Sequence, residues 1–163
     1  MAHDSGGWSG RHDHESCIAD ALTTAEEICR LRGVRLTPLR RRVLELIWGS
    51  HRPIGAYAVL AALRGERETA APPTVYRALD FLMEQGLVHR IQSLNAFVGC
   101  ADPDHAHNGM FLICGECGDT LEIEDAKLDD AIRSVASANG FALLRRTVEA
   151  TGTCPGCKPA RGA

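Results

Sequence analysis

Two pairs of cysteines have the spacing of a tetrahedral metal site. Two residues separate the cysteines of each pair, so both sulfurs can reach one ion from a tight turn; the pairs are Cys114 with Cys117 and Cys154 with Cys157. Structural zinc sites use four soft ligands of this kind. A rubredoxin-like iron site and a dithiol redox switch are the alternatives, but redox motifs usually open a helix and neither pair clearly does. We therefore predict one structural zinc ion held by these four thiolates.

A second, less conspicuous set of ligands lies around the first cysteine pair. His89, Cys100 and His107 precede that pair, with His105 close by, and Glu122 follows it. Each residue alone is a weak signal, since a lone histidine is usually a surface or core residue. Together, two imidazoles, one thiolate and one carboxylate suit Zn²⁺ and would neutralise its charge. Because the ligands come from both halves of the chain, we predict a reversible, metal-sensing zinc site, with His105 as an alternate ligand.

Charge is unevenly distributed along the 163 residues, whose net charge is −3. Arginines dominate residues 30–52, whereas acidic side chains dominate residues 116–130. A basic half beside an acidic half is typical of a protein that contacts an anion with one end only.

A cytoplasmic location is expected from the absence of export and membrane signals. Residues 1–16 are polar and lack the apolar region of a signal peptide. No apolar run approaches the roughly 18 residues that a membrane helix needs, so we expect no contact with a membrane. Cytosolic thiols stay reduced, which makes metal binding or redox chemistry the expected use of the seven cysteines.

The first hundred residues predict a winged helix-turn-helix with one extra leading helix. Apolar residues recur at helical spacing in four segments, with Gly33 closing the first helix and Thr37 capping the second. Two short strands joined by a turn follow the fourth helix. The expected helices and strands cover residues 18–32, 38–47, 55–64, 72–86, 87–91 and 96–100.

A smaller α/β unit is predicted beyond a polar hinge. Its expected strands cover residues 110–113, 120–124 and 142–150, and its helix covers residues 125–139. That helix is expected to turn four apolar side chains inward: Leu128, Ile132, Val135 and Ala136. A unit of about 55 residues is rarely stable through its hydrophobic core alone and needs a cross-link, such as a bound metal ion, or a partner chain. The chain is thus expected to be α+β, divided into a mobile tail (1–16), a winged-helix domain (17–100), a hinge (101–109) and the small unit (110–163).

Two segments of the chain, Arg35–Arg40 and Pro73–Leu79, resemble the hallmark segments of the ferric uptake regulator (Fur) family. Both Cys-x-x-Cys pairs match that family, and the resemblance extends from about Ala19 to Cys157. In detail the pattern is most similar to the family's zinc uptake regulator branch. The resemblance implies a homodimer with N-terminal winged helices and a C-terminal α/β dimerisation domain.

The resemblance also implies roles for the candidate ligands. The two cysteine pairs would hold structural zinc, and His89, Cys100, His107 and Glu122 match the regulatory site of the zinc branch, which gives two zinc ions per chain. The zinc-loaded homodimer would bind an inverted-repeat operator in double-stranded DNA and repress zinc-uptake genes.

An iron- or peroxide-sensing regulator of the same family is the alternative. Such relatives usually carry a His-His-x-His cluster just before the first cysteine pair, whereas residues 108–113 of this chain read Asn-Gly-Met-Phe-Leu-Ile. An enzyme with a small-molecule substrate is not expected, because four protein ligands leave no open position on the second ion.

The helix that begins near Pro73 is expected to lie in the DNA major groove. Arg77 is the best candidate for reading a base, because a guanidinium can pair with two acceptors of guanine. Tyr76, Thr74 and, on the preceding helix, Tyr57 are further candidates; the alternative is a solvated helix face. Phosphate contacts that position the domain are expected from four arginines: Arg35, Arg40, Arg41 and Arg42.

Overall fold

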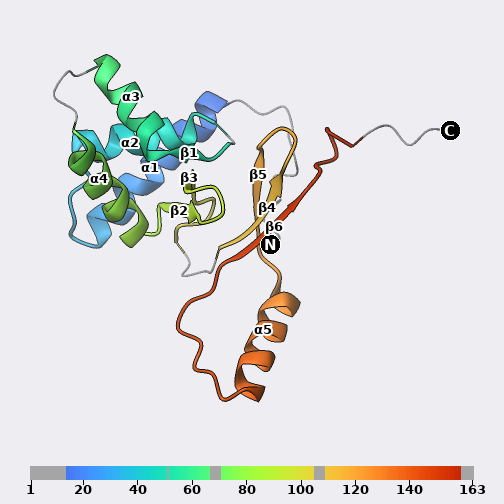
Figure 1. The fold of residues 1–163 in the computed structure, drawn as a ribbon. Helices are drawn as coiled ribbons and strands as arrows, with labels where there is room; N and C mark the ends of the chain where they lie inside the picture. Colours follow the sequence, from blue (N-terminus) through green and yellow to red (C-terminus); the bar gives the residue numbers. More distant parts are fainter. Residues whose placement is uncertain (1–13, 51, 67–70, 105–108, 159–163) are drawn as a thin grey trace.

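The computed structural model describes residues 14–50, 52–66, 71–104 and 109–158. Four helices and a small sheet form an N-terminal unit, and a second sheet with one helix forms a C-terminal unit (Figure 1). The helices are α1 (His14–Leu31), α2 (Pro38–Trp48), α3 (Ala56–Glu66), α4 (Pro72–Glu84) and α5 (Ala126–Ala138). The strands are β1 (Ile54–Gly55), β2 (Val88–Ile91), β3 (Ala96–Gly99), β4 (Met110–Cys114), β5 (Thr120–Ile123) and β6 (Val148–Gly152). The predicted α+β fold with a winged helix is confirmed.

The four N-terminal helices pack around one apolar core. Each helix contributes a buried face, for example Val43 and Ile47 from α2 and Leu82 from α4. Thr37 caps α2 as predicted, since its side-chain oxygen accepts a hydrogen bond from the backbone N–H of Arg40 at 3.4 Å. Because α4 buries only one face, its other face lies at the surface.

The first sheet has the strand order β1-β3-β2, and all its pairs are antiparallel. The β2–β3 hairpin is the predicted wing. Strand β1 was not predicted, because two residues are too few to show an alternating pattern. It pairs with the first half of β3 and so fixes the hairpin against the start of α3.

The second sheet has the order β5-β4-β6, with β5 antiparallel and β6 parallel to the central strand β4. The predicted strand at residues 142–150 is wrong over residues 142–147, because β6 begins at Val148. Val148 lies opposite Met110, the first residue of β4, so the residues before it have no strand to pair with. Leu144 there is 96% exposed.

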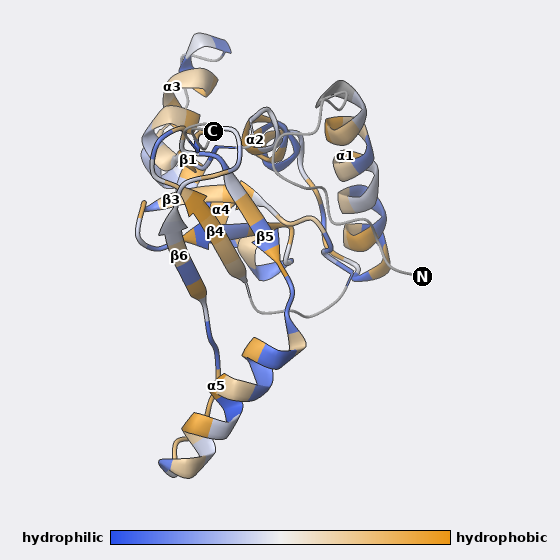
Figure 2. Cartoon of the chain, turned by 90° about the vertical axis from the view of Figure 1, so that its right-hand side faces the viewer, coloured by the Kyte–Doolittle hydropathy of each residue, from blue (hydrophilic) through white to orange (hydrophobic). Residues whose placement is uncertain are grey.

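Helix α5 begins where predicted, with Asp125 as its cap. The prediction that its apolar face is buried is wrong for the single chain. None of its residues is buried, Val135 is 65% exposed and Leu128 is 36% exposed. The helix projects away from the second sheet, with polar and apolar residues on its surface (Figure 2). Helical periodicity indicates that a face will be covered, but it does not tell whether the same chain covers it.

The predicted tail and hinge are described only in part. Helix α1 begins at His14, inside the segment 1–16 that we expected to be a tail. The hinge at residues 101–109 stays a prediction, since residues 105–108 lie outside the described ranges. None of the described helices is long and apolar enough to cross a membrane.

Replacing Gly99 by alanine should destabilise the N-terminal unit. A Cβ at this position would lie 2.3 Å from two atoms of the Trp48 ring, and overpacking of this kind costs about 1–3 kcal/mol. Gly65→Ala is the matched control, because nothing lies within 4 Å of a Cβ there and alanine favours a helix. Urea unfolding followed by circular dichroism measures both; a Gly99→Ala protein as stable as the Gly65→Ala protein would show that the contact is not tight.

Candidate metal centres and nucleic-acid interface

The two cysteine pairs form one cluster at the end of the second sheet. Cys114 ends β4, and Cys154 follows β6, which lies beside β4. The four Sγ atoms all lie within 4.8 Å of one another, and those of Cys117 and Cys154 are 3.8 Å apart. The structure therefore brings together all four residues that spacing alone had grouped.

Backbone N–H groups surround the sulfur of Cys114. The N–H of Cys154 donates to it at 3.4 Å, and the N–H groups of Cys117 and Cys154 hold the pKa of Cys114 down at about 6. Hydrogen bonds with the neighbouring thiols, that of Cys154 first, raise the pKa of Cys157 to about 12. Gly118 makes the tight turn possible, since it has a φ of +78° and donates to the Cys114 carbonyl at 2.9 Å. Four convergent sulfurs with donors to a thiolate fit a structural zinc ion.

A second cluster joins the two units. His89 on β2, Cys100 just after β3 and Glu122 on β5 each offer one ligand atom, and these atoms lie within 4.8 Å of one another. Nε2 of His89 and Oε1 of Glu122 are 2.8 Å apart. We call these three residues the mixed cluster. Its members come from both sheets, as predicted for a site assembled from both halves of the chain.

Neighbouring groups orient every member of the mixed cluster. The His89 ring packs edge-on against Phe111, with ring centroids 5.4 Å apart. The second carboxylate oxygen of Glu122 accepts a hydrogen bond from the N–H of Ala101 at 3.2 Å, and the N–H of Cys100 donates to the carbonyl of Leu87 at 3.0 Å.

Burial and charge keep the Cys100 thiol protonated in the absence of a cation. The side chain is 2% exposed, and burial first, then the Glu122 carboxylate, raise its pKa far above the usual value. A divalent cation would offset both effects, because it favours the thiolate and neutralises the carboxylate. The donor set of one imidazole, one thiolate and one carboxylate thus fits Zn²⁺. The predicted further ligands His107 and His105 lie outside the described residues.

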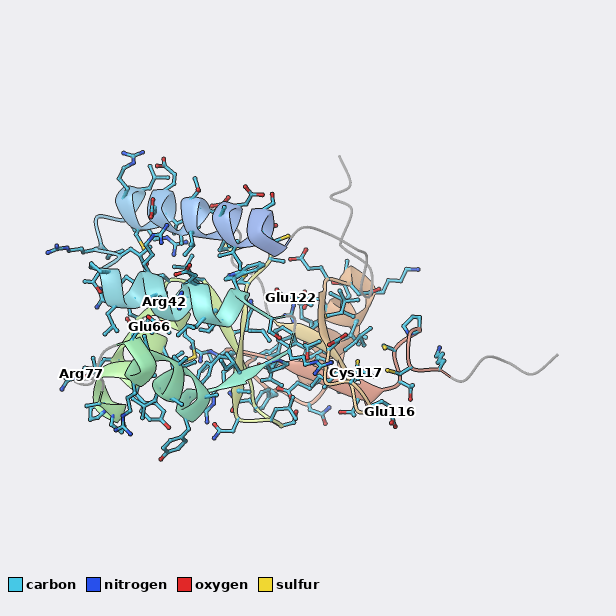
Figure 3. All side chains as sticks on the ribbon, turned by 90° about the horizontal axis from the view of Figure 1, so that it is seen from above. Arg42, Glu66, Arg77, Glu116, Cys117 and Glu122 are labelled. Carbon is cyan, nitrogen blue, oxygen red and sulfur yellow. The ribbon has the colours of Figure 1, made fainter. Side chains whose placement is uncertain are left out.

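The predicted base-reading residues lie together on the free face of α4. Thr74, Tyr76 and Arg77 are exposed, whereas Val75 between them is buried. Arg77 points away from the molecule at the outer edge of the N-terminal unit (Figure 3). Tyr57 is 74% exposed at the start of α3, the helix that precedes α4.

The predicted phosphate-binding arginines differ in what they contact. Arg35 is exposed. The guanidinium of Arg40 lies 3.6 Å above the ring of Phe81 and donates to the Arg35 carbonyl at 2.6 Å. Arg41 pairs with Glu26 at 2.9 Å. Arg42 pairs with two acidic side chains, Glu45 and Glu66. Sequence reasoning could not foresee these partners, because most of them belong to other helices.

Two further contacts between the units were also missed. Arg52, in the loop before β1, pairs with Asp119 beside the four-cysteine cluster at 3.1 Å. The Glu149 carboxylate on β6 accepts hydrogen bonds from the backbone N–H groups of Gln92 and Ser93 in the wing turn. No motif marks these residues, so sequence spacing carried no signal for them.

Comparison with known proteins places this arrangement in a family. Residues 31–151 match the ferric uptake regulator family. The zinc uptake regulation protein of Escherichia coli K12 is 43% identical over 139 residues, which cover 85% of this chain and 81% of that protein. A zinc uptake regulator solved in complex with zinc and DNA aligns with a TM-score of 0.82 at 42% identity, over 86% of this chain and 94% of its own.

One relative has been solved in two forms. The holo form of the regulator XcZur aligns with a TM-score of 0.78 at 43% identity, over 85% of this chain and 96% of its own. Its apo form covers 86% of this chain and 97% of its own at 40% identity, but its TM-score is 0.51. The structure of this chain is therefore more similar to the holo form than to the apo form. With a family match over most of its length and a curated relative above 40% identity, the chain belongs to the ferric uptake regulator family.

Proposed function

We propose that this chain is a zinc-responsive transcriptional repressor, which binds an operator as a homodimer and represses genes of zinc uptake. The observation that carries the proposal is the mixed cluster, whose three ligand atoms come from two different units and lie within 4.8 Å of one another. The similar proteins named zinc uptake regulators, one of them solved with zinc and DNA, support it. A regulator of this kind acts in the cytoplasm.

Two zinc ions per chain are part of the proposal. The four cysteines hold a structural ion. His89, Cys100 and Glu122 hold a regulatory ion, with His107 as the fourth ligand and His105 as its alternate. When bound at the mixed cluster, zinc supplies the positive charge that lets the Cys100 thiolate and the Glu122 carboxylate lie side by side.

The chain's own residues convert occupancy of this site into a domain arrangement. His89 belongs to β2, which follows directly on α4, whereas Glu122 belongs to the second sheet. Holding the two side chains together therefore fixes the orientation of α4 relative to the second sheet. Such coupling is reciprocal and typically amounts to about 1–3 kcal/mol, so DNA that selects this orientation also tightens the site.

Helix α4 is the proposed reading element. Arg77 donates to a base edge, and Tyr76 and Thr74 contact thymine methyl groups or phosphates. Tyr57 adds a contact from α3. Positioning contacts to phosphate come from three arginines: Arg35, Arg40 and Arg41.

The exposed face of α5 supports a homodimer. Leu128 and Val135 on the helix, with Phe141 and Leu144 after it, are all exposed apolar side chains of the C-terminal unit. Exposed apolar side chains of this kind are typical of an interface. A symmetric pair would present two α4 helices to half-sites about 34 Å apart, as an inverted repeat requires.

Iron or peroxide sensing is the alternative function within the family. A buried thiol in the mixed cluster favours zinc, because thiolate ligands select the softer metal ions.

Replacing Cys114 by serine should remove the structural zinc and unfold the C-terminal unit, because binding of such an ion supplies folding free energy. Cys17→Ser is the control, since Cys17 lies on α1 outside both clusters. Zinc content after dialysis against a chelator and far-ultraviolet circular dichroism, which detects loss of α5 and the second sheet, report the two effects. Equal zinc content in both variants would contradict the structural assignment.

Replacing Cys100 by serine should leave the fold and the four-cysteine zinc intact but abolish zinc-dependent DNA binding. Cys29→Ser removes an equally buried thiol of the N-terminal core and should keep the zinc response. Fluorescence anisotropy with a labelled zinc-uptake promoter fragment, at buffered free zinc, measures the response. A Cys100→Ser protein that still needs zinc and responds at the same concentration would refute the sensor site.

Replacing Arg77 by alanine should weaken operator binding by about 5- to 150-fold, the loss expected for one bidentate base contact. Binding to DNA of scrambled sequence should change much less. Lys127→Ala removes the same charge from α5 and should leave both affinities unchanged. An equal loss on operator and scrambled DNA would make Arg77 a phosphate contact instead of a base reader.

A further inference from the structure

Three side chains form one row across the second sheet. In the β4–β5 ladder Phe111 lies opposite Glu122, and in the β4–β6 ladder it lies opposite Glu149. Residues in register on neighbouring strands point to the same face of a sheet. Glu122 at one end of the row reaches His89 of the wing, so this face is turned toward the N-terminal unit.

The other end of the row holds the tip of the wing. The Glu149 carboxylate accepts hydrogen bonds from the backbone N–H of Gln92 at 2.6 Å and of Ser93 at 3.0 Å. These two residues open the turn between β2 and β3, which closes with a bond from the N–H of Asn95 to the carbonyl of Gln92 at 3.2 Å. Partial burial raises the pKa of Glu149, but the bonds from Ser93 and Gln92 outweigh it and leave the pKa below its usual value. The carboxylate is therefore charged at neutral pH.

The middle of the row is apolar and buried. Phe111 is 2% exposed and packs with Ile91 of β2, Val98 of β3 and Ile113 of β4. Its ring also contacts His89. Strand β2 and the turn that follows it thus contact the second sheet at two points, His89 at Glu122 and Gln92 at Glu149. The two contacts are three residues apart, which is about 10 Å of extended chain.

We propose that Glu149 is a positioning residue for the regulatory zinc site: by holding the wing turn, it keeps His89 in front of Glu122 and so raises the affinity of the mixed cluster for zinc. This inference rests on the proposed function. When the ligands of a site belong to two units that can move relative to each other, binding must also fix the two units in one orientation. The free-energy cost of this ordering lowers the affinity for the metal. Glu149 contacts no ligand, but it lowers that cost because its two hydrogen bonds hold the turn that directly follows the strand of His89.

The test compares full-length protein with the variants Glu149→Gln and Asp130→Asn. Asp130 is an exposed carboxylate of the same unit, on α5 and outside both metal clusters, so its replacement is a matched change of charge. Zn²⁺ is the probe, titrated in competition with a chelator of known affinity. We expect Glu149→Gln to bind the zinc of the mixed cluster at least about fivefold more weakly, and Asp130→Asn to match the unchanged protein. Amide hydrogen exchange at Gln92 and Ser93 should become faster in Glu149→Gln alone.

A variant on the other side of the contact tests the same bond. The turn closed by Asn95 and Gln92 puts Ser93 at its second position, which proline accepts. Ser93→Pro removes the N–H that Glu149 binds and should weaken zinc binding to a similar extent. The double variant should be little weaker than either single one, because both remove one interaction.

Three outcomes would overturn the inference. Zinc affinity of Glu149→Gln equal to that of Asp130→Asn would show that the wing contact does not support the site. Loss of the four-cysteine zinc from Glu149→Gln would make its role one of general stability. Additive effects of Glu149→Gln and Ser93→Pro would show that they act separately. Failure of the unchanged protein to bind a second zinc ion would instead refute the proposed function itself.

Discussion

His89 and Glu122 belong to different sheets, yet their side-chain atoms lie 2.8 Å apart beside the buried thiol of Cys100. A carboxylate and a thiolate withdrawn from water are unfavourable together unless a positive charge compensates them. Under the proposed function, a bound cation supplies that charge and strengthens this contact between the two units, beside the contacts of Arg52 with Asp119 and of Glu149 with the wing turn that need no cation. The better alignment with the holo form of a relative, at a TM-score of 0.78 against 0.51 for its apo form, is consistent with this role.

The two clusters differ in what their occupancy can change. All four cysteines belong to the C-terminal unit, and backbone N–H groups already favour a thiolate at Cys114. Under the proposed function, filling that site stabilises the C-terminal unit, which supplies all four ligands. The mixed cluster has a thiol whose pKa is raised and ligands from both units. Under the proposed function, occupancy of the mixed cluster is coupled to the relative orientation of the two units, and a metal response requires such coupling.

Local signals predicted most of the fold. Helical periodicity, the Thr37 cap and the Cys-x-x-Cys spacing each act within a few residues, so they can be read from the sequence. The mixed cluster was predicted from ligand chemistry, and the three members that the structure describes do meet. The predictions that were wrong and the contacts that were not predicted depend on residues far apart in the sequence. Tertiary packing determines four such features: the exposed face of α5, the residues before Val148 that pair with no strand, the stacking of Arg40 on Phe81, and the hydrogen bonds from the wing turn to Glu149.

The most direct test of the account follows metal content and DNA binding together while a chelator is added in steps. We expect one zinc ion per chain to leave in parallel with the loss of operator binding, and a second ion to stay with the folded C-terminal unit. Operator binding that persists after the first ion has left, or two ions that leave together as the protein unfolds, would contradict it.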